Sequence, residues 1–532
     1  MRARILFAKC AVVAAAIFLL GGPSAYSQNV QHLSVPQPGG MPGMPVMTGI
    51  VRATNGMTVS WDGPAGYYQL QQKSNLEDSK WVAVGKATNL VRRATITPLS
   101  SNAFFRVSGP APRYAGAQVC AECHAAIHTT ELRTAHAGAF TNAAFVAEGG
   151  QTNGACLVCH TVGYGLPTGF VSKSKTPLLA GVQCESCHGP AAPHAANPDD
   201  PIAVPRVELA ATVCGGCHTG SMQPTYDEWL TSGHAEVVAE ALDAMNSSTT
   251  DLNNCGRCHS ESVRWSLLKG IPLPVGDANV SLGCVTCHDP HQVTANPAQL
   301  RNPVASTADY SITASGNFTN QYNAGINICG QCHNDLASSW TNSIAPPHHS
   351  PQYNMLLGTV GVLDTTLPPN QPGSHALLVT NQCVQCHMQT ADSAGGQPAN
   401  TGHSFRIELY DTCLQCHPFM PEALAAFTKA GISNQIQQVK SDLDLWATSK
   451  APDQLRTNYL ARAWEYTTPG DLSPGGPGPT DAEQALIPEN IRKARYNLYV
   501  VLYDGSYGIH NINFATTLLE TAESWIREQL NQ

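Results

Sequence analysis

Charged side chains, spare cysteines and long apolar runs are all scarce in this chain of 532 residues. Asp, Glu, Lys and Arg make up only 13% of it, against about 25% in an average globular protein. The formal net charge of −9 argues against nucleic acid as a partner. Beyond the first residues no segment approaches 18 uninterrupted apolar residues, so the sequence predicts no transmembrane helix.

Every cysteine except Cys10 belongs to one repeated pentapeptide, Cys-x-x-Cys-His, which occurs nine times. Its cysteines are Cys120, Cys123, Cys156, Cys159, Cys184, Cys187, Cys214, Cys217, Cys255, Cys258, Cys284, Cys287, Cys329, Cys332, Cys383, Cys386, Cys413 and Cys416. The histidines that close the motifs are His124, His160, His188, His218, His259, His288, His333, His387 and His417. No cysteine is left over for a disulfide or a catalytic thiol outside the leader.

The pentapeptide is the attachment signature of a c-type haem. Two thiols on one turn can form thioethers with the two vinyl groups of a porphyrin, and the adjoining imidazole then reaches the iron from the proximal side. A disulfide framework or a zinc ribbon would not place a His after every second Cys. The sequence therefore predicts nine covalently attached haems c.

The remaining histidines are candidates for the second axial ligands. With His32 in a flexible tether set aside, ten are left for nine irons: His128, His136, His194, His234, His291, His348, His349, His375, His403 and His510. His348 and His349 are adjacent, so we expect only one of them to ligate. Met355 and Met388 are weaker alternatives, because Met more often fills gaps in a core. This supply predicts that every iron has two imidazole ligands.

The chain divides into five parts by composition. Residues 1–27 have the basic start, apolar stretch and Ala25-Tyr26-Ser27 site of a secretory signal peptide. Residues 28–46 form a Pro/Gly-rich linker, and residues 47–110 alternate short β-type runs with turns, which predicts a small β-sandwich-like module for attachment or spacing. Residues 113–420 hold all nine motifs, and residues 421–532 carry the three- and four-residue apolar spacing of helices.

The expected fold class is a multihaem cytochrome c, mainly α-helical and irregular. Haems replace side chains as the core of residues 113–420, between the N-terminal all-β module and a C-terminal helical cap. Four helices are expected in the cap, over residues 436–445, 454–464, 482–503 and 511–530. Thr480 and Glu483 have capping-box spacing at the start of the third. The cap is also expected to offer an oligomer surface.

Local motifs carry a family resemblance. Tyr114 to Ala235, including Thr134-Ala135-His136-Ala137 and Cys184-Glu-Ser-Cys-His-Gly-Pro-Ala-Ala-Pro-His194, resembles the tetrahaem electron-carrier cytochromes of ammonia oxidisers. Asp504-Gly-Ser-Tyr-Gly-Ile-His510 is similar to the last helical hairpin of the hydroxylamine oxidoreductase and pentahaem nitrite reductase superfamily. The resemblance implies closely packed haem pairs, and it implies that His510 is a distal ligand.

Three functions fit these features. The first is an exported electron carrier, periplasmic or extracellular, that works with redox partner proteins or extracellular electron acceptors. The second is a reductase or oxidase of small nitrogen or sulfur compounds with one five-coordinate haem, although no Cys-x-x-Cys-Lys motif marks such a haem here. The third is a filament-forming extracellular cytochrome. Fold alone does not choose among them, because function depends on the site.

Overall fold

The computed structural model describes residues 46–531, with gaps at 54–55, 63–67, 76, 78–79, 85–92, 97–103, 110, 202, 208, 276–280, 295–296, 302–327, 369–370, 380, 395 and 474. The proposed signal peptide, most of the linker and His32 lie outside the described residues. The chain forms two compact units. The first comprises residues up to Tyr226 together with Asp289–Val293, and the second comprises Asp227–His288 and Thr294–Gln532.

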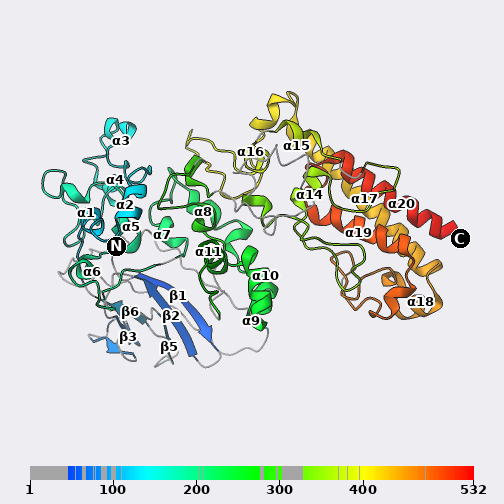
Figure 1. Ribbon diagram of the computed structural model, residues 1–532, viewed down its shortest axis with the longest axis horizontal. Helices are drawn as coiled ribbons and strands as arrows, with labels where there is room; N and C mark the ends of the chain where they lie inside the picture. The colour runs from blue at the N-terminus through cyan, green and yellow to red at the C-terminus, as the bar shows by residue number, and fades with distance from the viewer. Residues whose placement is uncertain are drawn as a thin grey trace. The chain divides into compact units, whose positions relative to one another are not determined.

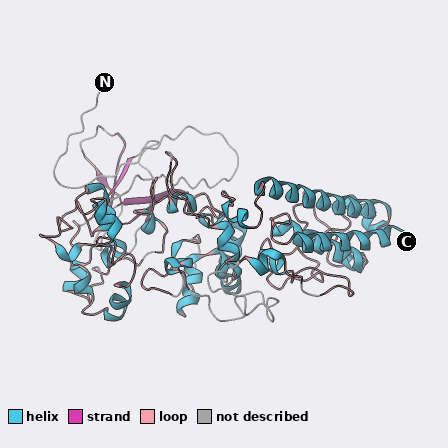
Figure 2. Ribbon diagram, turned by 90° about the horizontal axis from the view of Figure 1, so that it is seen from above, coloured by secondary structure: helices cyan, strands magenta, loops and turns pink. Residues whose placement is uncertain are grey.

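The first unit begins with two small antiparallel sheets (Figures 1 and 2). One has the order β1-β2-β5 and the other the order β4-β3-β6. The strands are β1 Val46–Ala53, β2 Gly56–Asp62, β3 Gln69–Lys73, β4 Val82–Ala83, β5 Arg93–Ile96 and β6 Phe104–Ser108. Alternate side chains from both sheets, including Val59, Trp61, Leu70 and Phe105, form one buried cluster, as the period of two in a strand requires.

Short helices joined by irregular segments follow the sheets. They are α1 Ala117–Cys120, α2 Ala125–Glu131, α3 Ala143–Ala147, α4 Gly154–His160, η1 Pro177–Leu179, α5 Cys184–His188, α6 Ala192–Ala196, α7 Thr212–Gly215 and α8 Thr225–Trp229. The buried apolar cluster among them is small and centres on Phe140, Leu157, Val162 and Phe170. Side chains alone therefore provide little core here, as expected where porphyrins fill the interior.

The second unit has the same character as far as residue 420. Its short elements are η2 Gly233–Ala235, α9 Ala239–Ser247, α10 Thr249–His259, α11 Glu261–Lys269, α12 Cys284–Cys287, η3 Pro297–Gln299, α14 Gln352–Leu357, α15 Ser374–Leu378, α16 Gln382–His387 and η7 Asp411–Gln415. No helix in the described part of the chain is long and apolar enough to cross a membrane.

Long helices replace the short ones after Pro421, and Figure 1 shows α17, α19 and α20 packed along one another. The elements are α17 Pro421–Ser449, α18 Asp453–Tyr459, η8 Leu460–Arg462, η9 Glu483–Leu486, α19 Glu489–Asp504 and α20 Ile512–Asn531. They enclose a large apolar core that includes Trp446, Trp464, Tyr499 and Leu518. The apolar spacing of residues 421–532 had predicted that this region is helical.

Two predicted helices are divided in the structure. The stretch 454–464 becomes α18, which ends at Tyr459, and the short η8, with Leu460 at their junction at φ 53° and ψ −128°. The stretch 482–503 becomes the short η9 and the long α19, separated by Ile487 and Pro488. Ile487 is extended, with φ −84° and ψ 122°, because the residue before a proline avoids the helical region. Thr480 and Glu483 are still hydrogen-bonded as predicted for a capping pair. Glu483 Oε2 accepts one bond from Thr480 Oγ1 at 2.6 Å and one from the Thr480 backbone N–H at 3.0 Å.

Candidate haem sites

Each Cys-x-x-Cys-His motif lies on one helical turn or at its end. In motifs such as Cys120–His124 and Cys413–His417 the histidine N–H donates to the first cysteine's carbonyl, at 2.8 and 2.7 Å. That i to i−4 bond places both sulfurs and the imidazole on one side of the turn. The arrangement suits two thioether bonds and one axial ligand to the same porphyrin.

Seven motif histidines face a second imidazole from elsewhere in the chain. The pairs, with their ring-centroid distances, are His136–His218 at 6.0 Å, His188–His291 at 5.8 Å, His234–His333 at 6.0 Å, His259–His348 at 5.8 Å, His288–His403 at 6.2 Å, His375–His417 at 6.3 Å and His387–His510 at 6.2 Å. Two imidazoles on opposite sides of one metal ion have centroids about 6 Å apart, because each metal–nitrogen bond is about 2 Å. The spacing therefore fits one iron between the rings of each pair.

Hydrogen bonds orient these rings through Nδ1 and leave Nε2 for a metal. Among motif histidines, His188 Nδ1 lies 2.8 Å from Arg206 O and His288 Nδ1 lies 2.7 Å from Ala298 O. On the opposite side, His375 Nδ1 lies 2.7 Å from Ile509 O. Such outer contacts fix both the tautomer and the ring orientation of a metal ligand.

Two carboxylates, the buried Asp504 and the half-buried Glu228, position individual partner histidines. Asp504 Oδ1 lies 2.6 Å from Nδ1 of His510, and the Asp504 side chain is only 1% exposed. Glu228 accepts the backbone N–H of His403 at 2.8 Å and two bonds from Thr401, the nearby hydroxyl and N–H groups. Sequence reasoning missed both residues, although the position of Asp504 six residues before a candidate ligand was a usable signal.

Burial keeps several of the paired imidazoles neutral. Desolvation, assisted by the neighbouring imidazole, lowers the pKa of His234 and of His348 to about 4. It also lowers the pKa of His136, again with a smaller contribution from its partner His218. Neutral imidazole is the form that binds a metal ion, so these groups are ready to ligate at neutral pH.

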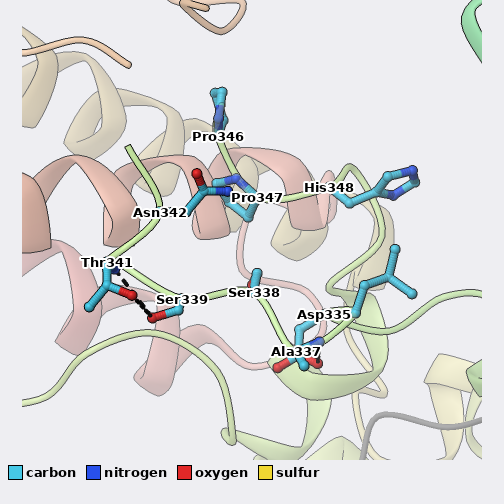
Figure 3. A pocket seen from close by; sticks show the side chains of 10 residues that line it. Asp335, Ala337, Ser338, Ser339, Thr341, Asn342, Pro346, Pro347 and His348 are labelled. Carbon is cyan, nitrogen blue, oxygen red and sulfur yellow. Dashed lines mark hydrogen bonds between the residues drawn. The ribbon is translucent and has the colours of Figure 1, made fainter. Parts of the chain in front are cut away.

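His348 also contributes to a cavity of about 400 Å³ in the second unit (Figure 3). The other lining residues come from Asp335 to Pro347, and Ser339 and Thr341 bond to each other there at 2.8 Å. The wall combines hydroxyl, amide and carboxylate groups with the apolar side chains of Leu336, Ala337, Pro346 and Pro347. Because His348 is paired with His259, the cavity borders one of the candidate haem sites.

The motifs are also close to one another, through their sulfurs. In the first unit the thiols of Cys120 and Cys184 are neighbours, since Cys184 is the main cause of the lowered pKa of Cys120, and the thiols of Cys159 and Cys217 are neighbours in the same way. Cys187 lies close enough to Cys217 to raise the pKa of its thiol, after larger contributions from Cys159 and burial. Among the first four motifs, the first therefore lies next to the third, the third next to the fourth, and the fourth next to the second.

The second unit has a corresponding series. Cys332 lies beside Cys258 and is the main cause of the raised pKa of its thiol, and it contributes, after burial, to raising the pKa of Cys287. Cys383 lies beside Cys329 and raises the pKa of its thiol. At the eighth motif, burial followed by the nearby Cys413 raises the pKa of the Cys386 thiol to about 11. The fifth and sixth motifs therefore both lie next to the seventh. The seventh lies next to the eighth, and the eighth lies next to the ninth.

The structure does not bring all ten candidate histidines to a motif. No imidazole of the described residues pairs in this way with His124 or His160, and His160 instead has the Phe145 ring stacked on it at 4.1 Å. His349 packs on Tyr503 at 3.8 Å. His128 lies on α2, and His194 lies on α6 with a buried Nδ1 that has no hydrogen-bond partner. Met355 is fully buried in the apolar core of the C-terminal helices.

Known proteins share parts of this sequence. The family described as cytochrome c554 and c-prime matches residues 119–189, and cytochrome c7 and related cytochrome c matches residues 169–260. Multiheme cytochrome MtrA of Shewanella baltica is 28% identical over 179 residues, which are 30% of this chain and 52% of that protein. Cytochrome c-554 of Nitrosomonas europaea is 32% identical over 117 residues, 20% of this chain and 48% of that protein.

The chain thus spans about half the length of these two relatives. C-type polyheme cytochrome OmcB of Geobacter sulfurreducens is 24% identical over 289 residues, which are 49% of this chain and 35% of that protein. Among solved structures, outer cell wall cytochrome OcwA has a TM-score of 0.48 and 18% identity, over 78% of this chain and 99% of that one.

Proposed function

Because this chain is a multihaem c-type cytochrome, we propose that it carries electrons along nine covalently attached haems, most of them bound between two histidines. Bound haem supplies the one-electron redox chemistry. The polypeptide holds the porphyrins by the motif cysteines, fixes the iron with the paired imidazoles and keeps neighbouring sites adjacent.

The observation that carries this proposal is the continuity of the motifs within each unit. Thioether bonds attach each sulfur directly to a porphyrin edge, so motifs whose sulfurs are in contact bring porphyrin edges close together. Cys120 with Cys184 and Cys258 with Cys332 are such contacts. Short gaps between edges favour electron transfer over bond-making chemistry, and two imidazoles on an iron leave no position for a substrate.

We further propose that the protein is exported, and that its partners are redox proteins or extracellular electron acceptors. The expected signal peptide supports export, as does the attachment of c-type haem after translocation in bacteria. The net acidic charge of the chain argues against nucleic acid as a partner.

Two measurements test the carrier function. Intact mass of the matured protein should correspond to nine haems, and eight or fewer would contradict the count. In stopped-flow mixing, the reduced protein should lose electrons from all its haems to a redox dye, while turnover with nitrite or hydroxylamine stays negligible beside that rate. Sustained turnover of either substrate would favour an enzyme.

The arrangement at His160 supports a second candidate function. With no second imidazole among the described residues, the haem at this motif is the best location for an open iron, where a small nitrogen or sulfur compound could bind. A high-spin ferric signal together with substrate turnover, both changed by Phe145→Leu, would favour this reductase or oxidase. A high-spin signal without turnover agrees with a carrier that has one five-coordinate haem.

A further inference from the structure

The β-sheet module differs in charge from the rest of this acidic protein. Residues 47–110 contain seven Lys and Arg but three Asp and Glu, a net charge of +4. Residues 113–420 contain ten Lys and Arg and 22 Asp and Glu, a net charge of −12. Haem propionates would make the second region more negative still. The module is therefore a cationic part of an anionic chain, which solubility alone does not require.

One face of the sheet β4-β3-β6 gathers cations, amides and aromatic rings. The burial pattern of β3 turns Gln69, Gln71 and Lys73 away from the core. That of β6 turns Phe104 and Arg106 the same way, and the strand register sets Arg106 opposite Gln71 and Phe104 opposite Lys73. The described side chains of these two strands include no carboxylate on this face.

Trp81 lies on this face next to two cations. Lys73 Nζ is 4.9 Å and the Arg106 guanidinium carbon 4.6 Å from the centre of its ring. The guanidinium is also fixed by a bond of 2.6 Å from its Nε to Gln71 Oε1. Trp81 itself is half-buried. It is therefore a partly exposed aromatic ring with two positive charges within 5 Å of its centre.

We propose that this face binds an anionic polysaccharide, with sugar rings lying on Trp81 and their carboxylates paired with Lys73 and Arg106. A planar guanidinium can both lie against an aromatic ring and bind a carboxylate by two parallel hydrogen bonds. Gln71 adds amide groups suited to sugar hydroxyls. The module then attaches a cytochrome that is otherwise repelled by acidic surfaces to an acidic polymer.

Two other polyanions fit the face less well. A membrane surface calls for large apolar side chains that project into the lipid, whereas Trp81 is half-buried and lies within 5 Å of two cations. Nucleic acid binding depends on many phosphate contacts, and the described side chains of this face offer only the two cations around Trp81, with Lys80 nearby. The proposal is independent of electron transfer, because no haem motif lies in the module.

Binding of the intact haem-loaded protein to immobilised polygalacturonate tests the proposal. The wild type should be retained at physiological salt, and Lys73→Gln with Arg106→Gln should weaken binding about tenfold or more. The matched control, Lys173→Gln with Lys175→Gln, removes two exposed charges from the haem-binding region of the same unit and should leave binding unchanged. Equal binding of the two double variants would overturn the proposal.

Substitutions of Trp81 separate stacking from charge. Trp81→Ala should weaken binding about tenfold even at raised salt, because salt screens charges but not ring contacts, while Trp81→Phe should retain most of it. Equal affinity of the wild type for uncharged dextran, or tighter binding to DNA or to vesicles of acidic phospholipid, would also refute the assignment. Unchanged haem content and far-ultraviolet circular dichroism establish that each variant is folded.

Discussion

The two units of this protein differ in how completely their motif histidines are paired. In the second unit all five of them, His259, His288, His333, His387 and His417, face another imidazole. In the first unit His188 and His218 do so, whereas His124 and His160 have no such partner among the described residues. Among the described residues the same motif therefore occurs both with and without a facing imidazole, and the difference lies in the segments that supply that second ring.

Those segments are held differently. In the second unit His510 lies in the turn between α19 and α20, fixed by Asp504 and by the large core of the C-terminal helices. His403 is fixed by Glu228. In the first unit His128 and His194 lie on helices of seven and five residues, without a comparable core. Secure placement of the second ligand therefore accompanies side-chain packing that does not depend on haem.

Removing one secure ligand should have the largest effect. His510→Ala should convert one haem to the high-spin state and create a new carbon monoxide site, while intact mass still shows every haem attached, because attachment depends on the thioethers. The matched control is His128→Ala, an unpaired histidine of the first unit, which should leave the visible and electron paramagnetic resonance spectra unchanged. An unchanged spectrum in His510→Ala would remove the basis for the pairing.

Carbon monoxide binding by the reduced wild type tests the comparison directly. We expect one or two binding haems per chain, at His124 and His160. Phe145→Leu should change the binding rate or the spectrum of the complex, because Phe145 is stacked on His160 at 4.1 Å. The exposed Phe427 provides the control Phe427→Leu, which should have no effect. Binding at no haem would mean that other groups complete both irons, and the distinction between the units would then disappear.

A smaller effect is expected from weakening one outer contact in the second unit. Asp504→Asn replaces the buried carboxylate beside His510 by a neutral amide, so the ligand becomes a weaker electron donor and its haem easier to reduce. We expect that midpoint potential to rise by about 60 mV, a tenfold change for one electron. Spectroelectrochemical titration measures it, with Asp442→Asn as control, because the half-buried Asp442 on α17 accepts a bond from Gln438 and contacts no candidate haem ligand among the described residues. A fall in potential, or an equal rise in the control, would contradict the role of Asp504.

Some of this organisation could be predicted from the sequence. The nine motifs have a fixed local geometry, so their helical turns followed from the pentapeptide alone. The C-terminal helices followed from periodicity, and the short β-type runs expected within residues 47–110 include β2 and β6. Pro488 was a visible reason for the break before α19, yet periodicity carried the expected helix through it.

The pairing of histidines could not be predicted, because it joins residues far apart in the chain. His234 meets His333 and His375 meets His417, and neither choice follows from sequence spacing. His291 follows His288 by three residues but faces His188. The expectation of nine two-histidine irons rested on counting, and counting cannot show that His349 packs on Tyr503 instead. Such pairings are set by tertiary packing.

The last prediction concerns a pair of buried glutamates, one in each unit. Glu185 of the first unit accepts the backbone N–H groups of Ala115, Gly116 and Ala191 at 2.7 to 3.1 Å. In the second unit Glu261 accepts the N–H and hydroxyl of Thr286, at 3.0 and 3.2 Å. Burial raises the pKa of Glu261 to about 7, although the bonds from Thr286 oppose the shift.

At pH 8 the two corresponding substitutions should change stability in opposite directions. Glu261 binds its proton more tightly in the folded protein than in the unfolded chain. Its contribution to the free energy of unfolding is therefore largest below the unfolded pKa near 4.5. This contribution, up to about 3 kcal/mol, is lost as the pH rises toward 7. Glu261→Gln removes this loss and keeps an acceptor for Thr286, so it should raise the melting temperature at pH 8 but not at pH 4. Glu185→Gln turns an amide NH₂ toward backbone donors and should destabilise by about 1–3 kcal/mol. Thermal unfolding followed by circular dichroism measures both changes. A lower melting temperature for Glu261→Gln at pH 8 would contradict the prediction. It would show that hydrogen bonds stabilise the charged carboxylate of Glu261 in the folded protein.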